Sequence, residues 1–419
     1  MKSFRLRNVC FGSLVIGLIW ITGPLLGQND KQDTKPEQAE TSAKKNPYDF
    51  SQPPELPSVE APSSLEIQQS IDRGVDFLLS CQRETGAWGA ATNTKDLNIY
   101  APVPGAHDGF RIATTSLCIT ALLTCDTSGK EDAVNQCIDK AEAWLMEHLP
   151  SLKRATSDAI YNCWAHTYSI DALLALRQRE GITDEKLAQL DELVRSQLKM
   201  LDTYESVDGG WGYYDFRYGG RKPTSDSTSF LNGASLIVMH NAQQAGFEVN
   251  QRTVTRAVAA TKRQRKPDFT YLYGEYMKNA PMAGINRPGG SLGRSQCCNL
   301  ALRIWGDQKI TDNVVKHWLV KLYQRNGWLD MGRKRPIPHE SWMGVAGYFY
   351  YFGHYYGALC IEELPPNERA PYQGMIAKIM LDKQEENGSW WDYPLYDYHQ
   401  QYGTGYGLLT LVQCLPSDD

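Results

Sequence analysis

The stretch RGVDFLLSCQRETGAW, from Arg73 to Trp88, predicts the end of an amphipathic helix followed by a tight turn that closes on an aromatic ring. Gln82 lies four residues after Leu78, on the same helical face, where its amide can bond backbone groups freed at the helix C-terminus. Gly86 permits the reversal of the chain, and Trp88 covers the turn with a large apolar surface. We interpret Gln82 and Trp88 as structural residues that join helices, with a ligand-contacting role as the alternative.

Weaker versions of this stretch recur along the chain, each after an amphipathic segment and before an apolar one. They are DGGWGY at Asp208–Tyr213, YQRNGW at Tyr323–Trp328 and DKQEENGSWW at Asp382–Trp391. A unit that recurs in this way is typical of repeat architectures, in which neighbouring units bury a continuous core. The repeat therefore favours one large unit over several separate domains.

Two kinds of helix are expected to alternate between residue 64 and the C-terminus. The amphipathic kind is predicted at 65–82, 131–149, 184–201, 251–264, 312–324 and 371–383. The other kind is apolar or aromatic nearly all round, at 114–124, 162–176, 228–245, 295–305, 346–361 and 402–415. A helix without a polar face is buried on all sides. The alternation predicts an all-α fold, a single (α/α)6 toroid with an inner ring of helices inside an outer ring.

The N-terminal part has a different character. Residues 1–27 combine Lys2, Arg5 and Arg7 with a short apolar run, which is typical of a secretory signal peptide. An uncleaved anchor is the alternative, although the run is short for a spanning helix. Residues 28–63 are polar and Pro-rich, and we expect a disordered linker. The folded domain is expected at 64–419 in an exported protein, periplasmic or extracellular.

Composition excludes some classes of function. The net charge of -5 is dispersed along the 419 residues, so no nucleic-acid footprint is expected. Tyr (23) outnumbers Phe (11), and buried phenols need partners, which suggests a partly polar cavity. The ten cysteines show no paired zinc spacing and mostly lie in apolar runs, so we expect mainly free thiols. Neither a metal site nor a cofactor is predicted.

The expected connections differ in length. Links from apolar to amphipathic helices are short, whereas links from amphipathic to apolar helices are long, and a toroid gathers all the long links on one face. Long loops on a rigid scaffold are where function concentrates. The same face receives the N-termini of the inner helices, each with a partial positive charge. We call this face the mouth, and expect it to suit a polar or anionic group above a more apolar throat.

Candidate site residues lie mainly in the mouth, where a carboxylate beside a His or Tyr can act as general acid and base. Surface loops are polar in any case. A His within an aromatic helix is more often a hydrogen-bonded core residue, and this holds for His166 and His354, with a place lining the central cavity as the alternative. The catalytic candidates are Asp397, His399, His339 and Glu340. The candidate substrate-binding residues are Trp211, Tyr213, Asp215, His166, His354, Trp342 and Tyr396.

The repeat resembles the Gln-Trp repeat of squalene–hopene cyclases and related terpenoid cyclases, shared more loosely with the β subunits of protein prenyltransferases. The residues that carry the resemblance are Arg73, Gly74, Phe77, Leu78, Gln82, Gly86 and Trp88, with Gln384, Gly388 and Trp390 as a second match. The resemblance implies a toroid over about residues 64–415. The chain lacks the Asp-x-Asp-Asp acid of those cyclases, the Asp-x-Cys zinc ligands of prenyltransferases and the Gly-Cys-Gly-Glu-Gln thioester of complement-type toroids.

Three functions remain open from the sequence. The first is a cyclase-like protein that binds or transforms an apolar isoprenoid or lipid in an aromatic inner ring. The second is a carbohydrate-active lyase or hydrolase that uses the tyrosine-rich mouth. The third is a non-catalytic binding module. The expected partner is an apolar small molecule or a glycan, association with a membrane surface is a further alternative, and the oligomeric state is open.

Overall fold

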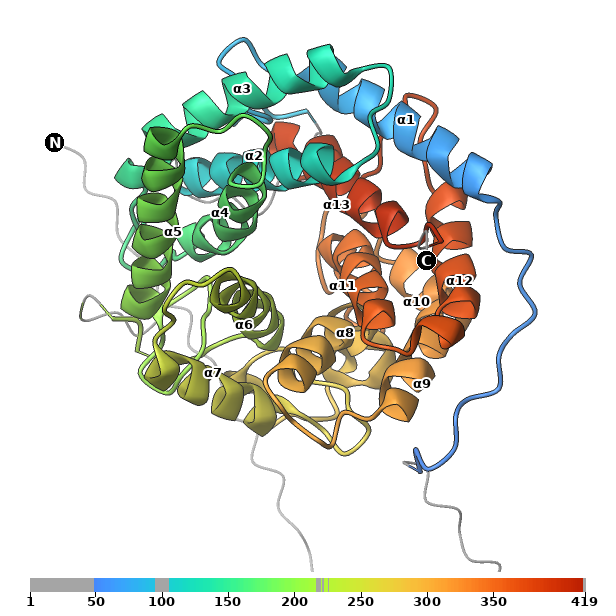
Figure 1. The fold of residues 1–419 in the computed structure, drawn as a ribbon. Coiled ribbons are helices and arrows are strands. Elements are labelled where there is room, and N and C mark those ends of the chain that lie inside the picture. The colour runs from blue at the N-terminus through green and yellow to red at the C-terminus, as the bar shows by residue number, and fades with distance from the viewer. Residues whose placement is uncertain (1–48, 95–104, 216–219, 221, 225, 417–419) are drawn as a thin grey trace, which may run out of the picture. The chain divides into compact units, whose positions relative to one another are not determined.

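Two concentric rings of helices make up the described part of the unit Pro47–Asp419 (Figure 1). The computed structural model describes residues 49–94, 105–215, 220, 222–224 and 226–416. The outer ring consists of α1 (Ser64–Cys81), α3 (Glu131–His148), α5 (Asp184–Tyr204), α7 (Gln251–Gln264), α9 (Asp312–Gln324) and α12 (Ala370–Asp382). The inner ring consists of α2 (Ala106–Thr124), α4 (Asn162–Leu176), α6 (Ser229–Gln244), α8 (Pro288–Ile304), α11 (Tyr350–Glu362) and α13 (His399–Val412).

Contacts between neighbouring helices close the inner ring. Each inner helix packs against the next along the chain, and α13 packs against α2, while α1 packs against α12 in the outer ring. The described residues contain isolated β-bridges but no strand. The expected all-α (α/α)6 toroid is confirmed. Short helices occupy the connections: α10 (Asn326–Asp330), η1 (Leu149–Ser151), η2 (Glu275–Met277), η3 (Gly284–Asn286), η4 (Gly347–Phe349), η5 (Pro366–Glu368) and η6 (Tyr396–Tyr398).

The two rings differ in burial as their sequences predict. Outer helix α5 buries one stripe, Leu190, Val194, Leu198 and Leu201, whose spacing of three or four residues follows the helical period. Inner helix α11 buries side chains on every side. Each fully buried Leu contributes roughly 1.5–3 kcal/mol of transfer free energy. Each outer helix is therefore stabilised by apolar burial on one face, and each inner helix by burial on every face.

Three tryptophans of the repeat make the same hydrogen bond. Trp88 Nε1 donates to the carbonyl of Leu78, Trp211 Nε1 to that of Leu201, and Trp390 Nε1 to that of Met380, each at 2.9 Å. The acceptors lie in the last turns of α1, α5 and α12. The last four carbonyls of a helix have no partner within the helix. Each tryptophan thus satisfies a carbonyl that the end of its outer helix leaves open.

Two glutamines of the repeat, Gln82 and Gln384, join consecutive outer helices. Gln82 Nε2 donates to the carbonyl of Gly86 at 2.9 Å and to that of Cys137 in α3 at 2.7 Å. Gln384 Nε2 makes the equivalent bonds to Gly388 at 2.9 Å and to Ser70 in α1 at 2.8 Å. The second pair links α12 to α1 and closes the outer ring. These contacts support the structural interpretation of Gln82 and Trp88.

Two inner helices begin seven or eight residues earlier than expected, and α13 begins three residues earlier, at His399. α2 starts at Ala106 rather than Thr114, which places His107 and Asp108 in its first turn. α8 starts at Pro288 rather than Ser295. Gly293 within this extension lies against Phe349, and a Cβ there would be 2.6 Å from the Phe349 carbonyl oxygen. The glycines that made this stretch look like a loop in the sequence are therefore part of the helix. They allow the connection before α11 to approach α8 closely.

The chain before α1 also packs against the rings. Residues 49–63 contain no helix, but Phe50 lies edge-on to Phe269 at 5.2 Å and Ala61 faces Gly374 in α12. We expected all of 28–63 to be disordered, but residues 49–63 pack on the helices. Phe50 supplies the apolar surface that anchors this segment. The expected signal peptide and residues 28–48 of the linker lie outside the described residues. No helix in the described part combines the length and apolar character that a membrane crossing requires.

Candidate functional site

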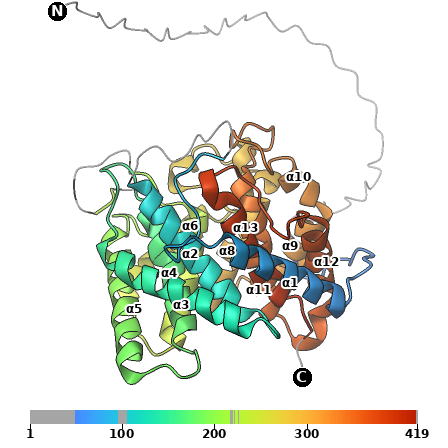
Figure 2. The same cartoon turned by 90° about the horizontal axis from the view of Figure 1, so that it is seen from above.

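The connections on the two sides of the toroid differ in length. Those that lead from an outer to an inner helix, on the mouth side, have 13 to 25 residues: 82–105, 149–161, 205–228, 265–287, 325–349 and 383–398. Those that lead back have six or seven: 125–130, 177–183, 245–250, 305–311 and 363–369. Figure 2 shows the helices side on, with the mouth at the top. The expected asymmetry between the two faces is confirmed.

Strained backbone is concentrated at the mouth. Five described residues other than glycine have positive φ, and all five lie in mouth connections. For a non-glycine residue such a conformation costs of order 1–3 kcal/mol, and strain of this kind clusters at functional sites. The residues are Asp226 (+75°), Phe269 (+60°), Lys334 (+65°), His339 (+63°) and Tyr396 (+46°). The mouth holds these side chains in place at a measurable cost in stability.

An aromatic floor lies beneath the mouth, formed by Tyr161, Trp164, Tyr213, Phe230 and Phe352. Tyr161 stacks on Tyr213 with ring centroids 5.5 Å apart, and Trp164 stacks on Phe230 at 6.0 Å. The Trp164 side chain of α4 lies edge-on to that of Phe352 of α11, with centroids 6.2 Å apart. Aromatic side chains from opposite helices of the inner ring therefore come together at its centre. Trp164 and Tyr213 remain half-buried and keep accessible surface. The throat below them is largely filled by aromatic side chains.

A hydrogen-bonded relay of three phenols and one imidazole crosses one side of the mouth. His339 Nε2 is 3.0 Å from Tyr348 Oη, which is 3.1 Å from Tyr273 Oη, and Tyr273 in turn hydrogen-bonds Tyr213. His339 Nδ1 lies 2.7 Å from the carbonyl of Gly344. A carbonyl can only accept, so Nδ1 carries the proton and Nε2 is left to accept from Tyr348. The relay joins the connections before α6, α8 and α11.

Burial keeps the histidine of this relay neutral. Removal from water lowers the pKa of His339, and the positive charge of Arg294 lowers it further, against the hydrogen bond to Gly344. Arg294 is fully buried and donates to three backbone carbonyls, those of Gly290, Tyr271 and Ile285. Burial lowers the pKa of Arg294 to about 10, so it stays charged at neutral pH. A positive charge therefore lies beneath the relay.

The carboxylates of the mouth are engaged by internal partners. Asp215 is buried and accepts from Arg154 at 3.1 Å and from Thr224 at 2.6 Å. Asp392 is buried as well and accepts from Tyr402 Oη at 2.6 Å and from the Tyr351 N–H at 3.1 Å. Burial raises the pKa of Asp392 to about 6. Neither acid is presented to solvent as an open catalytic carboxylate.

Asp397 and His399, two of the four predicted catalytic residues, do not contact each other as an acid–base pair would. Asp397 forms an ion pair with Arg83 at 2.5 Å and accepts from Gln401 at 3.3 Å. His399 is buried at the first residue of α13, and its Nδ1 is 2.6 Å from the Tyr396 carbonyl. The two side chains thus address different partners, so their joint catalytic role stays a prediction.

The other two predicted catalytic residues are adjacent in sequence but have different environments. His339 belongs to the phenol relay, whereas Glu340 is directed at Arg335, 2.9 Å away, on the exposed side of the connection. The structure thus brings His339 together with Tyr348 and Tyr273 rather than with Glu340. Of the predicted catalytic residues, His339 has the geometry best suited to proton transfer.

Three predicted substrate-binding residues are placed away from the mouth surface. Trp211 is fully buried in its repeat turn. His166 is buried and directed outward to Gln197 of α5, with Nδ1 2.6 Å from its side-chain oxygen. His354 is fully buried, with Nδ1 2.7 Å from the Tyr350 carbonyl. Burial lowers the pKa of both histidines to about 4, so both are neutral core residues. Their placement corrects the expectation that they face a ligand.

The remaining predicted substrate-binding residues lie at the mouth. Tyr213 is part of both the floor and the relay, and Asp215 lies beside it in the ion pair with Arg154. Tyr396 packs edge-on to His107 with centroids 4.7 Å apart. Trp342 is 74% exposed, and the Arg287 guanidinium lies 5.2 Å from its ring centroid. No group of three His, Cys, Asp or Glu side chains in the described part of the chain is arranged to hold a metal ion.

The sequence reasoning did not single out Tyr273, Tyr348 or Arg294. Both tyrosines occur in aromatic-rich stretches of mouth connections, YLYG at 271–274 in the connection before α8 and GYF at 347–349 directly before α11. Tyr213 lies in the corresponding connection before α6, but an aromatic residue in such a stretch resembles a core residue until its partners are known. Arg294 lies in a stretch expected to be a loop, so its burial could not be anticipated.

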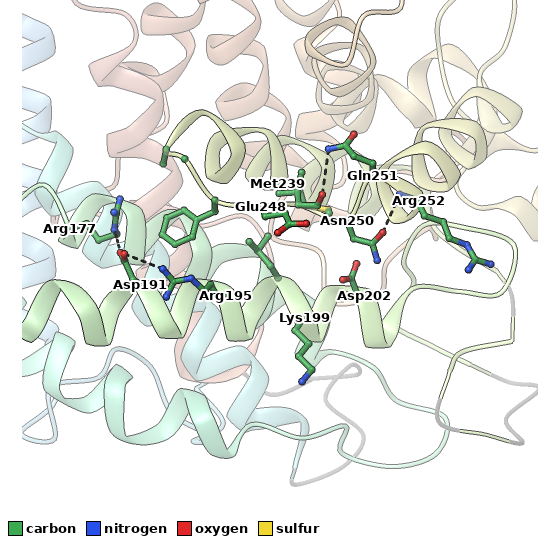
Figure 3. Close-up of a pocket in the computed structure, with 15 residues that line it drawn as sticks. Arg177, Asp191, Arg195, Lys199, Asp202, Met239, Glu248, Asn250, Gln251 and Arg252 are labelled. Atoms are coloured by element: carbon green, nitrogen blue, oxygen red, sulfur yellow. Dashed lines mark hydrogen bonds and ion pairs between the residues drawn. The ribbon is translucent and has the colours of Figure 1, made fainter.

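A separate cleft lies on the outer wall, away from the mouth. It has a volume of about 860 Å³ and is bounded by α5 and the short connection between α6 and α7 (Figure 3). Arg177 and Arg195 both point at Asp191 there, at 2.5 and 3.5 Å. Asp191 thus compensates part of the positive charge of the two arginines, and Arg195 also pairs with Glu192 at 3.7 Å. None of the candidate site residues lines it, so the mouth remains the candidate site.

Comparison with known proteins adds a family and a fold. The family model described as squalene-hopene cyclase C-terminal domain matches residues 55–280, a little more than half of the chain. No curated protein matches. The apo type II terpene cyclase MstE from Scytonema is 13% identical over 85% of this chain and 99% of its own, with a TM-score of 0.46. The GH76A α-1,6-mannanase from Salegentibacter sp. HEL1_6 is 10% identical over 83% and 98%, with a TM-score of 0.52, and shows the fold alone.

Proposed function

Because the chain belongs to the squalene-hopene cyclase C-terminal domain family, we propose that its mouth binds an apolar ring-bearing or isoprenoid lipid on the aromatic floor. The observation that carries the proposal is the meeting of Trp164, Phe230 and Phe352 at the centre of the inner ring, with Trp164 still accessible. Aromatic side chains supply large apolar contact areas with defined geometry. The ligand would lie on the floor rather than deep in the throat, which aromatic rings fill.

The electrostatics of the mouth support binding of an apolar body with a polar end. Asp215 and Asp392 are engaged internally, so the floor offers ring faces rather than open carboxylates. The phenols of Tyr213 and Tyr348 border the floor and can hydrogen-bond a hydroxyl or carbonyl group. Such a lipid would place its hydrocarbon on the rings and its polar end at the relay.

The test is a binding titration of the full-length protein with squalene and geranylgeraniol in detergent micelles, followed by ligand-protected thermal melting. Trp164→Ala removes the accessible ring of the floor and is expected to weaken binding by about tenfold. Trp144→Ala, which removes a ring stacked on His148 of the outer helix α3, is the matched control. Equal binding by the two variants, with both folded, would contradict the proposal.

The relay favours a second candidate, a carbohydrate-active enzyme. A neutral imidazole that accepts from a phenol can take up the phenol proton, so that the phenolate oxygen acts as base on a substrate and the imidazolium later returns the proton. His339 with Tyr348 has this geometry. The test is incubation with α-1,6-mannan and with a polyuronate, scored by new reducing ends and by the absorbance of unsaturated products. Turnover that Tyr348→Phe abolishes would support this candidate. Binding without turnover would indicate a non-catalytic module.

A further inference from the structure

The protons of the relay can be placed one by one, starting at His339. The imidazole is neutral, because burial lowers its pKa and the charge of Arg294 lowers it further. Its Nδ1 donates to the Gly344 carbonyl at 2.7 Å, so Nε2 can only accept. Tyr348 Oη lies 3.0 Å from Nε2. An acceptor left unpaired in a largely shielded site is destabilising, so Tyr348 gives its single proton to His339.

The proton of Tyr348 fixes the direction of the other two hydrogen bonds. Tyr348 Oη is 3.1 Å from Tyr273 Oη, and because its only proton is engaged with His339, Tyr273 is the donor in this contact. Tyr273 then has no proton for Tyr213, so Tyr213 donates to Tyr273. Burial raises the pKa of all three phenols well above their usual range, so each stays protonated. Every O–H bond of the relay is therefore directed along the relay toward His339.

The relay consequently offers lone pairs to a ligand but no proton. Tyr273 is buried, whereas Tyr213 and Tyr348 are half-buried and border the aromatic floor. The oxygen of Tyr213 accepts no bond within the relay, and that of Tyr348 accepts one, so both can accept a further hydrogen bond. Neither can donate one without breaking the chain of bonds that ends at His339. A ligand that hydrogen-bonds the relay therefore has to supply the proton itself.

We propose that the relay selects a ligand whose polar end is a hydroxyl group and discriminates against an aldehyde, a ketone or an ether, which can only accept. This selection rests on the proposed function, because the hydrocarbon of the ligand lies on the floor, to which Tyr213 also belongs. A carbonyl end would face phenol oxygens with no proton between them, and a site that leaves polar groups unpaired in this way rejects the analogue strongly. The substrate class is then an isoprenoid alcohol.

Binding of an alcohol and an aldehyde of equal size tests the selection. Dissociation constants are measured for the full-length protein in detergent micelles at neutral pH with geranylgeraniol, with its aldehyde geranylgeranial, and with squalene, which has no polar end. The alcohol is expected to bind about tenfold more tightly than the aldehyde. Equal constants for the two, with squalene bound, would overturn the selection and leave the proposed function intact. Failure to bind any of the three ligands would overturn both.

The variant Tyr348→Phe separates the relay from packing alone. It removes the oxygen between Tyr273 and His339, so the Tyr273 proton is no longer committed and the direction of the remaining bond is no longer fixed. The ratio of the two dissociation constants is expected to fall from about tenfold to about twofold or less. The control Tyr168→Phe removes a buried phenol that hydrogen-bonds Tyr406 in the throat, outside the relay and the floor, and should keep the ratio. A ratio that Tyr348→Phe leaves unchanged would contradict the proposal.

The direction of the relay can also be measured without a ligand. In the nitrogen NMR spectrum of the full-length protein with isotope-labelled histidine, His339 is expected as the neutral tautomer protonated at Nδ1. Its signals are assigned by their loss in His339→Asn, since Asn tolerates the positive φ of this position. A proton on Nε2 instead, or an imidazolium at neutral pH, would reverse the first bond of the relay and overturn the proposal.

Discussion

The two faces of the toroid meet the same backbone requirement with different residues. On the base side, the residues with positive φ in the described connections are all glycine, at Gly129, Gly181, Gly246 and Gly306. A Cβ at any of these four positions would meet open space. At the mouth, six glycines also have positive φ, but five bulkier residues adopt the left-handed conformation as well, among them His339. Glycine is the default wherever this conformation is needed only for a turn.

This difference between the two faces shows that some mouth positions keep a side chain although their backbone conformation alone would favour glycine. His339 is the clearest case, because both of its ring nitrogens are engaged in the relay while its backbone is strained. Strain of this kind persists only where surrounding contacts hold it in place. The base-side connections are short turns without backbone strain, whereas the mouth connections hold particular side chains, such as the His339 imidazole, in fixed positions.

The largest expected effect separates the structural glycines of the mouth from those of the base. Gly388→Ala would place a Cβ against the backbone carbonyl of Arg73 at a φ of +84°, and should lower the free energy of unfolding by roughly 3 kcal/mol or more. Gly246→Ala has a φ of +90° but open space around it, and should cost only about 1 kcal/mol. Urea unfolding of the two variants tests the contrast, and similar losses would break it.

The next largest effect is the pH dependence of the free energy of unfolding that Asp392 causes. Burial raises its pKa from 3.8 to about 6, so the folded state favours the protonated form relative to the unfolded chain. Its contribution to stability is therefore fully present below about pH 4 and is lost as the pH rises to about 6, by roughly 3 kcal/mol.

Asp392→Asn removes this titration. The difference in unfolding free energy between the variant and the native protein should shift in favour of the variant between pH 4 and 6. Urea unfolding across that range measures it. A difference that stays constant with pH would show that the carboxyl is not held in the protonated form.

The smallest effect has the opposite sign. Asp226 is half-buried with a φ of +75°, and Asp226→Gly should relieve its strain and stabilise the protein by about 1 kcal/mol or less. Asp226→Asn, which keeps the size of the side chain and tolerates the conformation better than most residues, is the matched control. If the glycine variant is less stable than the native protein, the side chain of Asp226 contributes more than its strain costs.

The sequence predicted the architecture because two periodic signals agreed. The Gln-Trp turns and the alternation of amphipathic with apolar helices both require two rings, and Gln82 and Trp88 make the contacts expected of structural residues. The extension of α8 was missed because glycine argues against helix locally, whereas packing against Phe349 favours it.

The site was predicted less completely for a different physical reason. A helix that is apolar all round does not reveal which side faces the centre, so His166 was kept as a candidate substrate-binding residue although it points outward to α5. His339 and Tyr213 were identified because they lie in long connections. Tyr273 and Tyr348 were missed because an aromatic residue before a buried helix is indistinguishable from core without its partners.

The most direct test of the proposed floor is native mass spectrometry, with solvent extraction, of the full-length protein purified from its own host. We expect an isoprenoid or other apolar lipid in stoichiometric amount, lost from Trp164→Ala and retained by Trp144→Ala. A native protein that is empty, and that does not take up squalene or geranylgeraniol when they are added back, would contradict it.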